Sequence, residues 1–163
     1  MAVRNCREIG ENLQKIVTRL MANDNLVKLL YYNDADPLSK ENLTEEEKKK
    51  CVFNKLIKIV PKVTKQETTQ SVVAIRVPSG IRVPSNKEFK VVTVNIEVFI
   101  PWDQWLFKSS NLRPFAILGE IQESLDGKTI NGLGKIDGGD FTLNYLTDEV
   151  ACYEQTFKIT SYD

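Results

Sequence analysis

The sequence predicts an α+β protein: a mostly antiparallel β-sheet with helices packed on one face and a protruding β-hairpin arm. Residues 3–22 show an amphipathic helical pattern, whereas residues 88–101 alternate between aliphatic and mixed positions along a long strand. Further strand patterns lie on both sides of a helical pattern at about 113–126. Runs of strands with few helices are typical of an antiparallel sheet that is covered on one side.

The whole chain, 1–163, is expected to form a single domain, because 163 residues suffice for a hydrophobic core. Within it, residues 1–55 form a helical N-terminal part, and residues 56–163 form the sheet with its one helix. Apolar residues make up 42% of the chain and charged residues 27%, which places it in the globular class.

The helical part contains three segments. The first helix ends at an Asn-Asp-Asn break, after which Asp24 or Asn25 caps a second short helix that reaches Tyr32. Thr44 and Glu47 have the spacing of a capping box and predict the start of the third segment.

The strand at 88–101 has the strongest strand pattern and is expected to lie centrally in the sheet. Two shorter strands precede it, at 56–60 and 72–77, and the polar residues 62–70 between them predict a mobile loop. One face of the long strand is mixed, and the other is wholly aliphatic and should be fully buried. The aliphatic residues are Val92, Val94, Ile96, Val98 and Ile100.

A short repeat predicts the hairpin arm. The sequence Ile-Arg-Val-Pro-Ser occurs at 75–79 and again at 81–85, separated by Gly80. Proline lacks the N–H that a β-ladder requires, so strand pairing should either fail here or reach an edge of the sheet, and leave an extended tip. Two interpretations stay open: a long hairpin turn, or an arm that grips a partner. The candidate partner interface consists of Arg76, Ile81, Arg82, Val83 and Lys87.

After the long strand, Trp102 and Trp105 form an aromatic corner, which favours a loop locked onto the core over a ligand site. Pro114 marks the start of the next helix and Gly127 its end.

Residues 129–140 hold four glycines, but they follow a helix and precede a strand. A phosphate-binding loop requires the reverse order, so we interpret this segment as a turn. Two alternating strand patterns, centred on 141–145 and 153–159, complete the sheet.

The residue inventory argues against an enzyme, a metal site and a cofactor. Histidine is absent, which removes the usual general base and the commonest metal ligand. Cys6, Cys51 and Cys152 are isolated, which indicates free thiols rather than a zinc site. Charges near the N-terminus argue against a signal peptide, and no apolar run approaches the roughly 18 residues of a membrane helix.

The formal net charge is zero, but the charge is unevenly distributed. Residues 111–163 contain nine acidic and four basic residues, so the remaining 13 acidic and 18 basic residues lie in 1–110. This asymmetry favours head-to-tail contact with copies of the chain or with a partner.

Taken together, the chain resembles the tail terminator (tail completion) proteins of tailed bacteriophages. The resemblance lies in the leading helix, in the strand beginning Thr93-Val-Asn-Ile-Glu, in Arg113-Pro-Phe-Ala-Ile-Leu-Gly-Glu-Ile, and in the ending Asp148-Glu-Val-Ala-Cys-Tyr-Glu-Gln-Thr-Phe-Lys-Ile. The insertion from Asp34 to Lys55 is longer than compact members of that family need.

The resemblance implies a structural virion protein without enzymatic activity, assembled in the host cytoplasm and located at the tail or neck. It implies a ring of copies, a hexamer, that ends the tail tube, contacts neck proteins and lets DNA pass through its lumen. Another head-tail connector or head-completion ring protein stays open as an alternative. So does a small nucleic-acid-binding module, for which Lys90 beside Phe89 and Phe99 is the sequence feature.

Overall fold

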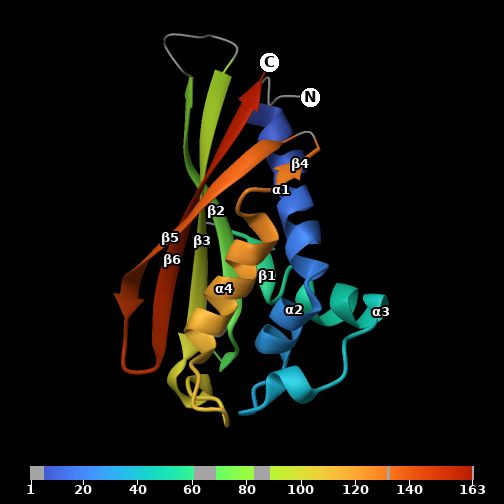
Figure 1. Ribbon diagram of the computed structural model, residues 1–163, viewed down its shortest axis with the longest axis vertical. Coiled ribbons are helices and arrows are strands. Elements are labelled where there is room, and N and C mark those ends of the chain that lie inside the picture. Colours follow the sequence, from blue (N-terminus) through green and yellow to red (C-terminus); the bar gives the residue numbers. More distant parts are fainter. Residues whose placement is uncertain (1–5, 61–68, 83–88, 132, 163) are drawn as a thin grey trace.

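The computed structural model describes residues 6–60, 69–82, 89–131 and 133–162. In these residues a curled, six-stranded sheet carries helices on one face (Figure 1), which confirms the predicted α+β class. The predicted loop at 62–70 lies largely outside the described residues.

The sheet has the strand order β1-β2-β3-β6-β5-β4. All neighbouring strands are antiparallel except β1 and β2, which are parallel. The long strand predicted at 88–101 is β3, with neighbours on both sides, as expected. The strands are β1 (Ile57–Ile59), β2 (Val72–Arg82), β3 (Phe89–Pro101), β4 (Thr129–Ile130), β5 (Gly134–Leu146) and β6 (Val150–Tyr162).

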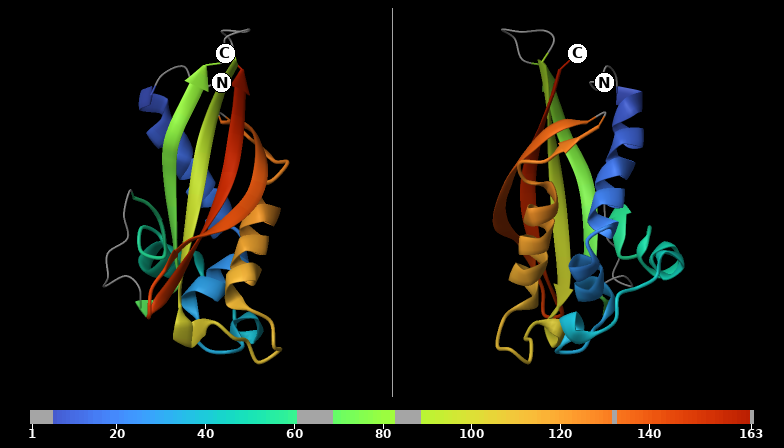
Figure 2. Two further views of the ribbon diagram at one scale, coloured as in Figure 1. Left: turned by 90° about the vertical axis from the view of Figure 1, so that its left-hand side faces the viewer. Right: turned by 45° about the vertical axis from the view of Figure 1, so that its right-hand side comes forward.

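Figure 2 shows the three longer helices, α1, α2 and α4, on one side of the sheet. None of the described helices is long and apolar enough to cross a membrane. The helices are α1 (Cys6–Met21), α2 (Asp24–Tyr31), α3 (Glu45–Glu47) and α4 (Arg113–Leu125), with a π-helical turn η2 (Lys48–Val52) and 3₁₀ turns η1 (Pro37–Ser39) and η4 (Trp102–Gln104).

Helix boundaries follow the predicted caps with one correction. The capping box is present, since Glu47 N–H donates to Thr44 Oγ1 and Thr44 N–H donates to Glu47 Oε2. Asn23, rather than Asp24 or Asn25, caps α2 by accepting a hydrogen bond from Leu26 N–H. The cap of α2 therefore lies one residue earlier than predicted.

The hydrophobic core lies between the helices and the sheet. The aliphatic face of β3 belongs to it, and Ile96, Val98 and Ile100 have no exposed surface. The prediction of which face is buried is therefore confirmed. Helices α1, α2 and α4 contribute Ile16, Leu20, Leu26, Leu30, Ile117 and Ile121 to the same core.

Two strands differ from the prediction. β2 does not stop at Pro78: its pairing with β3 resumes at Ser79 and continues to Arg82 after a register shift. Beyond the β1 contact, β2 is an edge strand among the described strands, so the missing N–H of Pro78 interrupts little. The arm is thus a continuous extension of the sheet.

β5 begins at Gly134, so much of the segment interpreted as a turn is strand. Gly138 has φ of +141°, and a Cβ there would lie 2.5 Å from the carbonyl oxygen of Thr156. A bulge of this kind needs glycine, which is why a strand contains residues that favour turns.

Candidate functional site

The predicted partner residues do not form one site. Ile81 lies on β2 opposite Val91, next to the end of the strand, and is 64% exposed. Figure 1 shows that this end of the β2–β3 pair extends beyond the helices. The backbone of Arg82 pairs with Lys90, but its side chain lies outside the described part of the structure. Val83 and Lys87 also lie outside the described residues.

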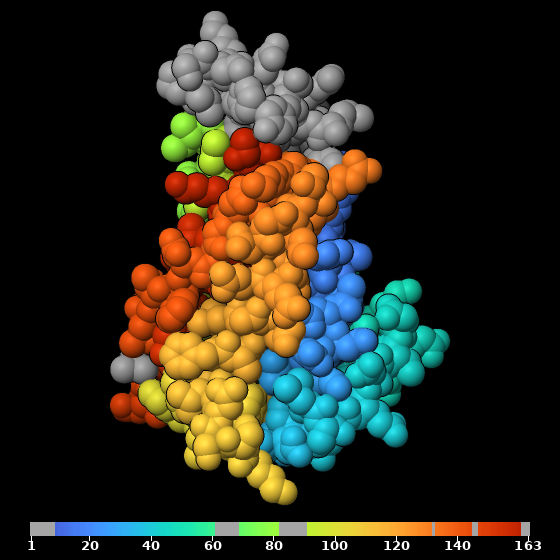
Figure 3. Space-filling model, viewed as in Figure 1, coloured from blue at the N-terminus to red at the C-terminus, as the bar shows by residue number. Residues whose placement is uncertain are grey.

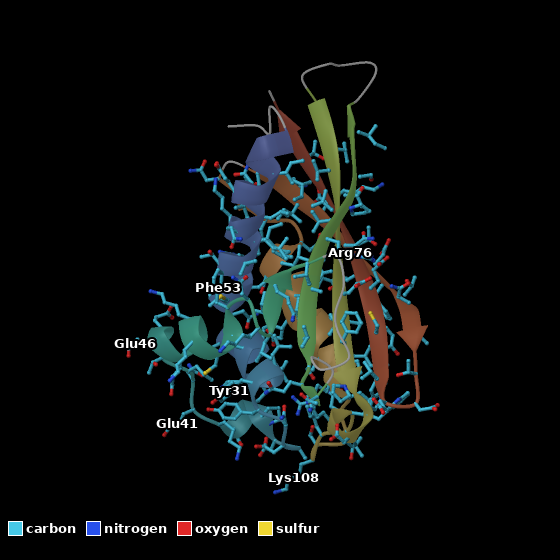
Figure 4. All side chains as sticks on the ribbon, turned by 180° about the vertical axis from the view of Figure 1, so that it is seen from behind. Tyr31, Glu41, Glu46, Phe53, Arg76 and Lys108 are labelled. Atoms are coloured by element: carbon cyan, nitrogen blue, oxygen red, sulfur yellow. The ribbon has the colours of Figure 1, made fainter. Side chains whose placement is uncertain are left out.

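The prediction placed Arg76 at the tip of the arm. The structure instead places it halfway along the sheet (Figure 4). Its Nη2 group donates hydrogen bonds to Glu97 Oε1 on β3 and, at 2.9 Å, to Glu154 Oε2 on β6. Asn144 on β5 donates to the same Glu97 oxygen at 3.2 Å. One polar cluster thus links four neighbouring strands on the face opposite to the helices.

Burial sets the electrostatics of this cluster. Glu97 is only 6% exposed, and this burial raises the pKa of its carboxyl above the ordinary value against the opposing effect of Arg76. Burial also raises the pKa of the Cys152 thiol to about 12, and the charges of Glu97 and Glu154 act in the same direction. A thiol with such a high pKa is a poor nucleophile. The cluster therefore links strands through ion pairs and hydrogen bonds.

Most of the feature named for nucleic-acid binding, Lys90 beside Phe89 and Phe99, lies outside the described side chains. Phe99 is half-buried, and the side chains of Phe89 and Lys90 lie outside the described ones. The centre of the face instead carries the Glu97 and Glu154 carboxylates, which repel phosphate.

A polar hollow of about 730 Å³ lies between α1, α2 and α4. Asn23 donates to Glu120 Oε2 and to Ser124 Oγ, both at 2.9 Å. These bonds join the start of α2 to α4, so the polar groups of the hollow serve helix packing.

An aromatic patch appears where β5, the start of α4 and the end of β3 meet. We define it as Trp102, Trp105, Phe115, Phe141, Leu143 and Tyr153. The ring centroids form a continuous chain, with separations of 4.9 Å for the tryptophan pair, 6.3 Å from Trp105 to Tyr153 and 5.6 Å from Tyr153 to Phe115. These are the distances of interacting aromatic pairs.

Much of this patch faces solvent. Trp102 and Phe115 are each 42% exposed, Phe141 50% and Leu143 51%. Figure 3 shows that the start of α4 and the later part of β5 both form outer surface on this side of the molecule. Contiguous exposed apolar side chains of this size mark protein-interaction sites.

The tryptophans also have the structural role expected from the sequence. Trp102 Nε1 donates to the carbonyl oxygen of Thr147 at 2.8 Å, which ties η4 to the β5–β6 turn. Next to it, the fully buried Arg113 donates to the carbonyl oxygens of Gln104, Leu29, Tyr32 and Asp34. These hydrogen bonds therefore hold in place the segments next to the patch.

Exposed acidic residues accompany the patch in sequence and on neighbouring strands. Asp103 follows Trp102, and Asp148 and Glu149 lie in the turn bonded to Trp102. Asp140 precedes Phe141 but lies on the opposite face of the sheet, because its partner Thr156 pairs with Asn95 on the face away from the helices. None of these four carboxylates forms an ion pair with another described residue.

Sequence reasoning identified the two tryptophans but missed Phe115, Phe141 and Leu143. In the sequence they look like ordinary core positions of a helix and a strand. Register shifts in β5 near Gly138 and Leu143, together with the place where α4 begins, leave them uncovered.

No curated protein matches the chain. The family model named YomW matches residues 23–159, which include β1 to β5 and most of β6. YomW is a phage-type protein, in agreement with the phage origin that the resemblance implies. Since the match extends over most of its length, the chain belongs to the YomW family.

Proposed function

We propose that the protein is a structural virion protein of the tail-terminator type, which forms a ring at the end of the phage tail tube and joins it to the head or neck. Membership of a phage-type family supports the phage setting. The sheet with its helices on one face supports the resemblance in architecture.

The observation that carries the proposal is the exposed Ile81 on the β2–β3 extension. A β-branched residue that is 64% exposed contributes little to the core and is costly to leave in water. In a ring, each subunit would present this strand pair to the same side. A circle of such apolar contacts is suited to hold a tail tube or a neck protein.

The proposed partners are copies of the chain, arranged in a hexamer by analogy with tail terminators, together with tail-tube and neck proteins. In this proposal, genomic DNA passes through the lumen without sequence-specific contacts. The protein would assemble in the host cytoplasm and remain in the virion.

The test is the double change Ile81→Asp with Arg82→Glu in a phage-complementation assay, beside a thermal melt. We expect normal melting and loss of infectious particles, because an aspartate cannot replace an aliphatic contact. The matched control is Leu38→Asp, since Leu38 is 45% exposed and lies on η1 near the other end of the molecule (Figure 1). The control should support infection.

Infectious particles with the double variant would overturn the role of the arm. Mass photometry of the wild-type protein, alone and with purified tail tubes, tests the ring itself. A protein that stays monomeric in both samples would contradict the proposed function.

A further inference from the structure

Another exposed apolar side chain, Phe53, lies on the side of the molecule opposite to the aromatic patch. Phe53 follows η2 directly and is 36% exposed. Figure 4 places it beside the helices, with β5 and β6 on the far side of the sheet, and Figure 2 shows the same separation of these segments. We call Phe53 with Lys49, Lys50 and Lys55 the basic knob.

The knob has free positive charge. Lys49, Lys50 and Lys55 are exposed and form no ion pair with another described residue. Lys48, by contrast, turns inward and binds Asp24 at 2.8 Å and Glu45 at 3.2 Å. Glu47 is occupied by the capping box. Among these neighbours, Glu46 is the acidic side chain that forms neither an ion pair nor a capping bond with another described residue, so the three lysines give this surface a positive charge.

The two surfaces match in chemistry. The aromatic patch is broad and is accompanied by Asp103, Asp148 and Glu149, whereas the knob is one aromatic ring among three lysines; none of these charged groups has an ion-pair partner among the described residues. An aromatic residue that enters an apolar patch within a ring of opposite charges is the usual composition of an interaction hot spot. Neither surface suits a copy of itself, because like charges would meet.

We propose that the basic knob of one copy binds the aromatic patch of a second copy, in a head-to-tail contact. The inference rests on the proposed ring, which it deepens by naming the subunit interface. A contact between two different surfaces on opposite sides of the subunit is heterologous. Such contacts close into a ring when the rotation between neighbouring subunits is a whole fraction of a full turn. The uneven charge of the sequence is partly reflected in this pair, because the knob lies in the basic part, 1–110, and four of the six patch residues lie in the acidic part, 111–163.

The strand order explains why the basic knob and the aromatic patch lie on opposite sides of the molecule. β1 and β2 lie at one end of the sheet and β5 and β4 at the other. Among the described strands, β5 has only β6 as a neighbour after its short contact with β4. The patch therefore stands beside an open strand edge, where a second copy can approach closely.

The experiment uses two full-length variants, Phe53→Glu and Phe141→Glu, each breaking one half of the contact. By analytical ultracentrifugation over a concentration series, each variant alone should associate about tenfold more weakly than the wild type or not at all. Mixed together, they should form a one-to-one dimer and nothing larger. Each dimer then contains one intact knob bound to one intact patch.

Leu38→Asp is the matched control, since it replaces an exposed apolar residue outside both surfaces and should associate like the wild type. Circular dichroism confirms that all three variants fold, as expected for partly exposed positions. Added salt should weaken the wild-type association, because screening acts on exposed charges.

Three results would each overturn the inference. The Phe53→Glu variant could associate as strongly as the wild type, the mixture could contain no dimer, or the wild-type protein could be monomeric up to its solubility limit. Phage complementation with Phe53→Glu distinguishes a failure of this inference from a failure of the proposed function. A variant that no longer self-associates but yields infectious phage would contradict the ring function and leave the interface in place.

Discussion

The two faces of β3 exclude water in different ways. On one face Val94, Ile96 and Val98 are buried beneath helices. On the other face no described helix lies over the strand, yet Glu97 is only 6% exposed. There the covering groups are Arg76 and Asn144, which reach across from neighbouring strands.

The comparison shows two routes to burial with different sensitivity to mutation. A helix-covered position depends on shape and apolar area, because its contacts are dispersion and exclusion of water. A position covered by polar side chains depends on every partner being present, because a buried carboxylate without a partner is costly. The predictions below separate the two.

The largest effect is expected on the helix-covered face. Ile96→Ala should lower the free energy of unfolding by about 2–5 kcal/mol, because it removes buried methylene groups and leaves a cavity. Ile96→Val serves as control and should cost about 0.5–1.5 kcal/mol. Urea denaturation measures both. A loss below about 0.5 kcal/mol for Ile96→Ala would contradict the assigned burial.

On the open face, Arg76→Ala should cost about 1–3 kcal/mol, because it leaves the Glu97 carboxylate buried without its cation. Glu97→Gln in the Arg76→Ala background should recover part of this loss, since a neutral amide needs no counter-charge. A double-mutant cycle by urea denaturation gives the coupling. Additive losses would show that the pair does not act as a unit.

A smaller effect concerns pH. Because the pKa of Glu97 is raised in the folded protein, its carboxyl takes up a proton at higher pH when folded than when unfolded. Its contribution to stability should therefore increase as the pH falls from the raised pKa toward the ordinary value of 4.5, and should level off below it.

Thermal melts of the wild type and of Glu97→Gln across this window provide the measurement. The difference between the two proteins should change with pH. A difference that is constant with pH would show that Glu97 titrates alike in both states.

The smallest effect is expected at Cys152. With its pKa raised to about 12, the buried thiol favours the folded state up to the ordinary value of 9.0, and this contribution is lost as the pH rises further. At pH 8, iodoacetamide should label the half-buried Cys51 faster than Cys152, as followed by peptide mass spectrometry. Faster labelling of Cys152 would contradict the burial of this thiol on the face of the sheet opposite to the helices.

Local patterns predicted much of the fold because they report short-range physics. The alternation of β3 identified its buried face, the apolar spacing identified α1 and α4, and Thr44 with Glu47 identified a capping box. The start of β5 was missed because the glycines near 138 resemble a turn, although they serve a bulge.

The candidate surfaces were predicted less well. Ile81 was identified as exposed from the repeat around Gly80, and this is confirmed. Arg76, in the same repeat, was expected beside it and instead binds Glu97, 21 residues away in sequence. Phe53 was not singled out, because a phenylalanine after an amphipathic segment looks like core.

By itself, the sequence determined the class of each main element, the buried face of the central strand and the uneven charge. These depend on the order of residues within one element or on their sum. Only the tertiary structure decided that Arg76, Glu97 and Glu154 meet, and that Phe115 and Phe141 stay uncovered side by side. Strand register, bulges and helix placement bring distant residues together, and no local pattern contains that information.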